Sequence, residues 1–115
     1  MTLSEKQCVF FNMVSLLGIE ATNRGLKIKL TEWFRSPEKQ LKLLRAGKTW
    51  TLNSAHIHGL AIDIAIIKDG RYIVDGESYR PLGEYWKELT GIWGGDWKVK
   101  DYCHFEYTRN QHKEG

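Results

Sequence analysis

The sequence predicts one small domain that combines α-helices with β-strands. Three stretches have helix-capping residues or apolar residues at helical spacing, at residues 4–18, 36–47 and 81–91. Three short stretches are rich in β-branched, aromatic or alternating apolar residues, as strands are, at residues 26–34, 60–67 and 103–107. A chain of 115 residues can bury one modest core, and no internal repeat or linker divides it.

The composition is that of a soluble globular chain, with 42% apolar and 27% charged residues. No stretch approaches the roughly 20 apolar residues that span a bilayer, and no secretory leader is evident. We therefore expect synthesis in the cytoplasm and no membrane insertion. A net charge of +3 serves solubility or gives weak attraction to an anionic polymer. The basic residues form no stripe and no Cys/His finger is present, which argues against nucleic-acid binding.

The first predicted helix begins near Ser4, which forms a capping-box pattern with Gln7. Apolar residues then recur at helical spacing as far as Gly18, at Phe10, Phe11, Val14 and Leu17. We expect this helix to be scaffold, with both phenylalanines in the core.

A half-buried strand follows, because apolar residues alternate with lysines over residues 26–30. The strand runs on to deliver Arg35 to the second helix, for which Ser36 is a suitable N-cap and Pro37 a suitable first residue. From this junction the Arg35 guanidinium can bind a carboxylate or a developing oxyanion. The alternative is a salt bridge to Glu32 or Glu38.

The segment from Ser54 to Asp63 carries the first candidate metal ligands, His56 and Asp63. Gly59 lets the backbone turn sharply, and the apolar run 60–67 predicts a buried strand that contains Asp63. A buried carboxylate is costly unless it is paired or bound to a metal. Imidazole and carboxylate groups are ligands of zinc, so these residues predict a zinc site. His58 is a competing ligand, since it shares a face with His56 in an extended segment.

Turn and helix signals fill the region between the candidate ligands. Asp69-Gly70 predicts a tight hairpin. Pro81 suits the first turn of a third helix, which has an apolar stripe and ends at Gly91. The Trp- and Gly-rich segment 93–97 predicts a loop. We expect Trp93 to lie in the core, whereas Trp97 is equally suited to the core and to the wall of a site.

His104, in the predicted last strand, is the natural third ligand. Asp101 precedes it by three residues, close enough to accept a proton from a metal-bound water. Cys103 is adjacent to His104 but points to the opposite face of a strand, so we predict a structural thiol. Glu106 shares the face of His104 and is suited to orienting a ligand imidazole, or is a solvated carboxylate.

Two motifs together resemble a known enzyme family. Ser54-x-His56-x-x-Gly59-x-Ala61-x-Asp63, followed by Asp101-x-x-His104, resembles the zinc peptidases that cleave D-amino-acid-containing bonds of peptidoglycan. These are D-Ala-D-Ala dipeptidases and carboxypeptidases, and the L-alanyl-D-glutamate endopeptidases used as phage endolysins. The segments 35–40 and 93–97 extend the resemblance to roughly residues 30–107. Many members have Glu where this chain has Asp101.

The resemblance implies an α+β fold, with helices packed on a small antiparallel sheet and zinc on the open side of the sheet. From the chain length we expect one catalytic domain at residues 1–107, and from the polar composition of the last residues a tail at 108–115. The resemblance selects His56 over His58, so the implied zinc ligands are His56, Asp63 and His104.

The resemblance also assigns roles to the residues around the metal. It makes Asp101 the general base and gives Arg35 a role in binding substrate or the transition state. It places Ser54 in contact with substrate, although Ser54 is equally suited to capping the turn before His56. Trp97 is the remaining candidate for substrate contact, and Glu106 the candidate for supporting a ligand.

We therefore expect a monomeric zinc peptidase that acts on peptidoglycan stem peptides, specifically an L-alanyl-D-glutamate endopeptidase serving as a phage endolysin. Such an enzyme would reach the bacterial wall only after release from the cytoplasm. The alternatives are a D,D-carboxypeptidase or D-Ala-D-Ala dipeptidase, and a non-catalytic zinc module that binds wall peptides.

Overall fold

A computed structural model describes residues 1–49 and 54–108. The predicted polar tail therefore lies outside the described residues, apart from Thr108. Within the described part of the chain, the helices are each too short or too polar to cross a bilayer.

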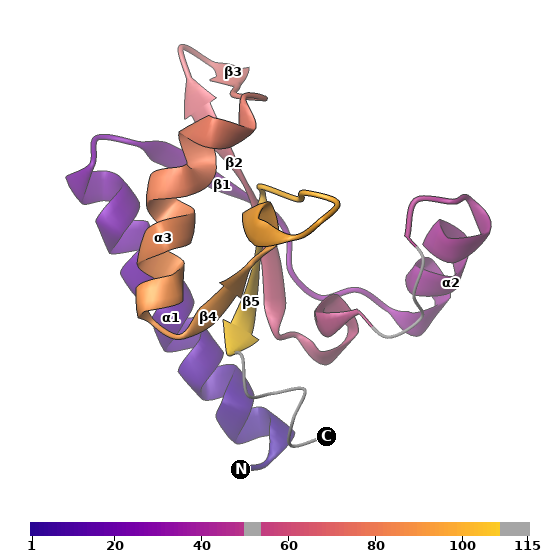
Figure 1. The fold of residues 1–115 in the computed structure, drawn as a ribbon. Coiled ribbons are helices and arrows are strands. Elements are labelled where there is room, and N and C mark those ends of the chain that lie inside the picture. The colour runs from indigo at the N-terminus through magenta and orange to yellow at the C-terminus, as the bar shows by residue number, and fades with distance from the viewer. Residues whose placement is uncertain (50–53, 109–115) are drawn as a thin grey trace.

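The strands form one antiparallel sheet in the order β1-β2-β5-β4, with β3 paired to β2 (Figure 1). The strands are β1 (Lys27–Glu32), β2 (Ala61–Lys68), β3 (Arg71–Tyr72), β4 (Gly91–Trp93) and β5 (His104–Thr108). Because β2 and β5 are neighbours, residues 41 positions apart in sequence come into register, and Asp63 lies opposite His104.

The helices α1 (Leu3–Asn23) and α3 (Arg80–Glu88) cover one face of the sheet, whereas α2 (Pro37–Arg45) lies apart from them (Figure 1). Phe10 of α1, Trp86 of α3 and Phe105 of β5 meet edge to face, with ring centroids 5.9 and 5.7 Å apart. All three are at least 97% buried, and such aromatic contacts stabilise a core beyond the area they bury. The predicted fold class, α+β with an antiparallel sheet, is confirmed.

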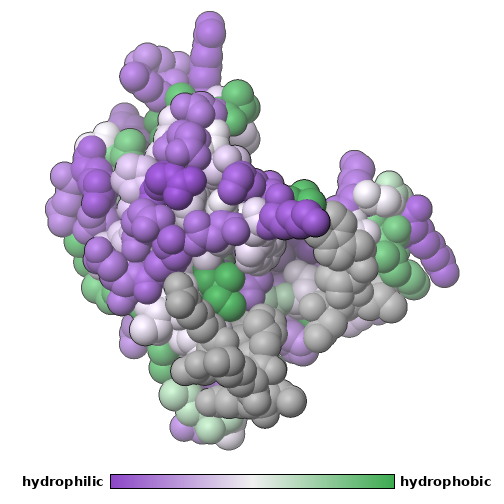
Figure 2. Space-filling view, in the orientation of Figure 1, coloured by the Kyte–Doolittle hydropathy of each residue, from purple (hydrophilic) through white to green (hydrophobic). Residues whose placement is uncertain are grey.

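Strand alternation assigns each side chain of β2 to one face of the sheet. Ile62, Ile64 and Ile66 belong to the core. Asp63 and Ala65, between them, face the opposite, open side. Figure 2 shows that the surface over α3 is predominantly hydrophilic, whereas Leu82 and Trp86 of this helix are buried.

The first helix differs from its prediction at both ends. Its N-cap is Thr2, in a capping box with Glu5 rather than between Ser4 and Gln7. It continues past Gly18 to Asn23, because Ala21 on its last turn is buried in the core. The prediction that Phe11 is a core residue was wrong, since its side chain is 69% exposed.

The other elements follow their sequence signals more closely. Ser36 caps α2 by accepting a hydrogen bond from the Lys39 amide. Asp69 and Gly70 both have positive φ, as a tight hairpin turn requires. The prediction that Gly91 ends the third helix was wrong. It lies in β4, where any side chain would collide with the Trp86 indole.

Candidate active site

Three side chains from separate elements converge on the open side of the sheet: His56, Asp63 and His104. Their ligand atoms all lie within 4.8 Å of one another. Asp63 Oδ1 is 3.3 Å from His56 Nε2 and 3.1 Å from His104 Nδ1. The three metal ligands predicted from the sequence are therefore brought together, and the two imidazoles are presented to the same carboxylate oxygen.

His56 is held by a short 3₁₀-helix, η1 (Ala55–His58). The Ser54 hydroxyl caps its start by accepting from the His56 amide at 3.2 Å. Gly59 ends it at φ 65°, pressed against the Trp33 ring. The Trp33 carbonyl lies 2.8 Å from His56 Nδ1, so the other nitrogen, Nε2, is the one turned toward Asp63. This carbonyl was not foreseen, because a backbone oxygen leaves no mark in the sequence.

His104 is oriented by Glu106, two residues along β5 on the same face. Glu106 Oε1 lies 2.8 Å from His104 Nε2, and the Glu106 side chain is buried. His104 therefore turns Nδ1 toward Asp63. Ligand imidazoles in metal sites almost always donate their second N–H to a carbonyl or a carboxylate. Both histidines have such a partner here. Of the two roles that the sequence left open for Glu106, contact with a ligand imidazole is the one observed, since the side chain is buried rather than solvated.

Burial and hydrogen bonding shift the pKa values of the two central groups in opposite directions. Burial alone would raise the pKa of Asp63, but hydrogen bonds from His104 and His56 outweigh it and hold this pKa well below its usual range. Burial alone would lower the pKa of His104, but Asp63 and Glu106 raise it to about 9. A proton on His104 thus compensates two carboxylates when no metal is bound, and a metal cation can replace that proton.

This donor set fits zinc. Two imidazole nitrogens and one carboxylate oxygen are the ligands of a catalytic zinc, which keeps a fourth position open for water or substrate. His58 and Cys103, which could also bind a metal, do not belong to this set of ligands. Among the described residues, only His56, Asp63 and His104 form such a cluster. His58 is exposed on η1, and Cys103 is half-buried beside the site.

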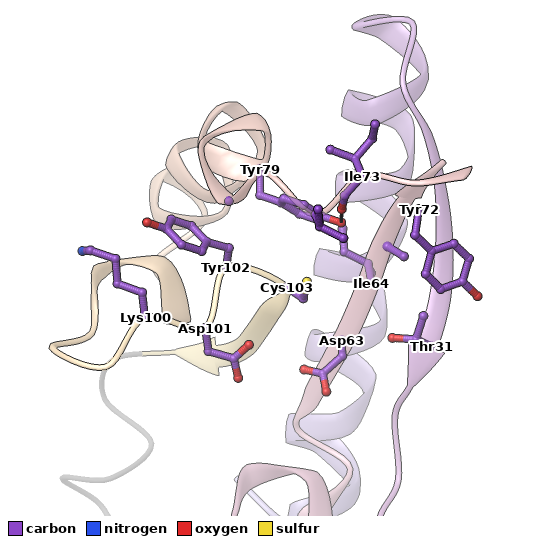
Figure 3. Close-up of a pocket in the computed structure, with 13 residues that line it drawn as sticks. Thr31, Asp63, Ile64, Tyr72, Ile73, Tyr79, Lys100, Asp101, Tyr102 and Cys103 are labelled. Atoms are coloured by element: carbon purple, nitrogen blue, oxygen red, sulfur yellow. Dashed lines mark hydrogen bonds between the residues drawn. The ribbon is translucent and has the colours of Figure 1, made fainter. Parts of the chain in front are cut away.

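Asp101 faces Asp63 across an open pocket (Figure 3). Two backbone hydrogen bonds fix its position, from the Asp101 amide to the Gly94 carbonyl at 2.9 Å and from the His104 amide to the Asp101 carbonyl at 3.2 Å. Gly94 is required here, because any side chain would strike the Asp101 backbone. Desolvation raises the pKa of Asp101, opposed by the nearby His104. A carboxyl group with a raised pKa both accepts and returns a proton more readily near neutral pH.

Arg35 is joined to the site through its backbone and through Glu32. The Arg35 amide donates to the His56 carbonyl at 3.0 Å. Its guanidinium is paired with Glu32 and donates to Gln40 Oε1 at 2.9 Å. The alternative of a salt bridge to Glu32 is therefore present, and substrate contact by Arg35 stays a prediction. Gln40 is fully buried and positions this segment.

Trp97 lies beside the metal ligands rather than in the core. Its ring centroid is 4.9 Å from that of His104, and its side chain is 36% exposed. Trp93 is the core residue of the pair, as predicted, with 1% exposure. Trp97 can thus form part of a wall for substrate.

The fold and the site together define a small α+β zinc peptidase. The chain belongs to the D-alanyl-D-alanine carboxypeptidase family of M15 peptidases, whose model matches residues 47–107. This membership confirms the predicted family and its peptidase activity.

Similar proteins include peptidoglycan endopeptidases. The chain is 38% identical over 114 residues to the peptidoglycan L-alanyl-D-glutamate endopeptidase CwlK of Bacillus subtilis (strain 168), a match that covers 82% of this chain and 68% of CwlK.

Two solved structures share the fold. The L-Ala D-Glu endopeptidase ChiX of Serratia marcescens is 28% identical, with a TM-score of 0.67 over 76% of this chain and 71% of ChiX. The vancomycin-resistance D,D-pentapeptidase VanY, solved as an E175A mutant with Zn(II), has a TM-score of 0.62 over 85% of this chain and 70% of VanY. At 22% identity, this likeness concerns the fold alone.

Proposed function

We propose that this chain is a zinc-dependent L-alanyl-D-glutamate endopeptidase of peptidoglycan stem peptides. The observation that carries the proposal is the placement of Asp101 across an open pocket from Asp63, which belongs to the His56–Asp63–His104 group. The identity to CwlK and the likeness to ChiX support the L-alanyl-D-glutamate bond as the target.

The chain's own residues divide the work of hydrolysis. His56, Asp63 and His104 hold zinc, which when bound supplies the Lewis acidity that brings the pKa of water from about 15.7 toward about 7. Asp101 accepts a proton from the attacking water and returns it to the leaving amine. The Arg35 guanidinium releases Glu32 when substrate binds, and it then stabilises the negative charge that develops on the oxygen of the scissile carbonyl. Ser54 and Trp97 contact the peptide.

The biological role that we propose is that of a phage endolysin, made in the cytoplasm as a monomer and active on the wall after release. Purified protein added to permeabilised bacteria should lower the turbidity of the suspension. Unchanged turbidity would contradict this role. Size-exclusion chromatography with light scattering measures the oligomeric state.

A second candidate is a D,D-carboxypeptidase, because the matching family carries that description. Mass spectrometry of digested peptidoglycan separates the two activities. The endopeptidase releases a new alanine carboxyl terminus together with a new glutamate amino terminus. Loss of a single terminal D-alanine would instead support the carboxypeptidase.

A further inference from the structure

The segment that carries His56 depends on other parts of the chain for its position. η1 is a single turn of 3₁₀-helix, and such short helices have poor hydrogen-bond geometry and little stability of their own. Its internal hydrogen bonds run from the Ile57 amide to the Ser54 carbonyl and from the Gly59 amide to the His56 carbonyl, each at 3.1 Å. Tertiary contacts must therefore supply the rest of the order that a metal ligand requires.

Two side chains from distant parts of the chain donate to the end of this segment. The Gln7 side-chain amide, on α1, donates to the His58 carbonyl at 2.8 Å, across 51 residues of sequence. The Trp33 indole, directly after β1, donates to the Gly59 carbonyl at 3.0 Å, across 26 residues. These bonds join η1 to the first helix and to the end of the first strand.

The same two side chains lie against the bare backbone of Gly59. A Cβ atom at Gly59 would be 2.9 Å from Gln7 Nε2 and 3.2 Å from the Trp33 ring. The positive φ of Gly59, 65°, also favours glycine. Trp33 contributes a further bond, since its carbonyl lies 2.8 Å from His56 Nδ1. Trp33 therefore holds both the turn, through its indole, and the imidazole, through its backbone.

Gln7 and Trp33 are not placed to contact substrate in the pocket. Glu32 is in register with Asp63, on the open face. The next side chain, Trp33, points away from that face, toward Gln7 of α1. Neither residue lines the pocket beside Asp101. The 48% exposure of the Trp33 side chain is thus explained by its contact with η1.

We propose that Gln7 and Trp33 are positioning residues that hold the zinc ligand His56 in its binding geometry before the metal arrives. A protein whose binding-competent conformation is populated for only a fraction of the time binds its ligand more weakly by that fraction. This inference deepens the proposed function and rests on His56 as a zinc ligand, whichever peptide bond is cut. It gives α1, which the sequence predicted to be scaffold, a part in metal binding.

Two conservative variants test the inference by zinc affinity. Trp33→Phe removes the indole N–H but keeps an aromatic ring, and Gln7→Ala removes the amide. Each should weaken zinc binding by about 3- to 10-fold, the effect of one hydrogen bond. The double variant should weaken it by about 10- to 100-fold, the range for residues that support a metal ligand. Competition with a chelator at fixed pH measures these affinities.

Controls and a second measurement separate positioning from general stability. Phe34→Leu and Phe11→Ala change exposed side chains close in sequence to Trp33 and Gln7 and should keep the wild-type zinc affinity. In the metal-free double variant, the amides of residues 57–60 should exchange hydrogen faster than in the wild type. At saturating zinc the kcat should return to near the wild-type value, because the bound metal then fixes His56.

Wild-type zinc affinity in the double variant would overturn the inference, even if the free energy of unfolding falls, because a merely structural role predicts that result. If Trp33→Phe does not fold, the zinc titration of Gln7→Ala decides. Failure of the zinc-saturated wild type to cleave stem peptides would contradict the proposed endopeptidase function, and the zinc titrations would still decide this inference.

Discussion

The two faces of strand β5 are built on different principles. Phe105 points into the helix-covered face, where it is fully buried against Trp86. His104 and Glu106, its immediate neighbours, point to the open face and are also buried. The helix-covered face is stabilised by close packing and by burial of apolar surface, whereas the open face depends on the compensation of buried charges. A single strand can thus be altered to affect folding or chemistry separately.

The largest effect is expected when a metal ligand is removed from the open face. His56→Ala should abolish both zinc binding and peptidase activity, because only two of the three protein ligands would remain to hold the metal. Metal analysis of the purified variant and hydrolysis of peptidoglycan measure the two losses. His58→Ala removes an exposed imidazole two residues away and should retain zinc and activity, and equal losses in both variants would contradict the assignment.

Substitution of Asp101 should separate metal binding from chemistry. Asp101→Asn should retain one zinc ion per chain while turnover falls by a factor of about 100 to 10,000, the contribution of a general base. Asp96→Asn is the control, since Asp96 is exposed and paired with Lys87. Near-normal turnover in Asp101→Asn would show that another group takes the proton.

On the helix-covered face, Phe105→Ala should lower the free energy of unfolding by about 3–5 kcal/mol, because it leaves a cavity under α3. Phe11→Ala removes an equal side chain from an exposed position and should change stability by less than about 0.5 kcal/mol. Urea denaturation of both metal-free variants provides the comparison. Similar losses would mean that α1 packs differently from the arrangement described.

The smallest effect concerns pH. The pKa of His104 is raised from 6.5 to about 9 by Asp63 and Glu106. In the metal-free protein, the interaction of protonated His104 with the two carboxylates stabilises the folded state. This contribution to the free energy of unfolding is complete below about pH 6.5 and is lost as the pH rises through about 9. Zinc affinity should increase as the pH rises, by about tenfold per pH unit below pH 9, because zinc must displace the proton on His104.

Thermal melts of the chelator-treated protein and competitive zinc titrations from about pH 6 to pH 8 measure both trends. A metal-free protein that gains stability over this range, or a zinc affinity independent of pH, would contradict the charge compensation on the open face.

The metal ligands were predictable because burying an ionisable side chain costs free energy unless a partner compensates it. Asp63 interrupts an apolar β-branched run, and a buried carboxylate requires a compensating partner. Alternation along β5 then placed His104 and Glu106 on one face and excluded Cys103. The antiparallel pairing of β2 with β5 was not predicted, because two strands so far apart in the chain carry no local signal for it.

Features set by tertiary contacts could not be predicted from local patterns. Gly18 costs α1 only about 1 kcal/mol, and burial of Ala21 carries the helix past it. Gly91 resembled a helix terminator, but its role is to make room for the Trp86 indole. The carbonyl of Trp33, which orients His56, is a backbone group that every residue possesses.

Zinc-edge X-ray absorption spectroscopy of the purified protein tests most directly whether the open face is a zinc site. One zinc ion per chain should show only nitrogen and oxygen neighbours at about 2.0–2.2 Å, with the outer-shell signature of two imidazoles. A sulfur neighbour at about 2.3 Å would place Cys103 or Cys8 in the coordination shell. That result, or the absence of bound zinc, would contradict the His56–Asp63–His104 site.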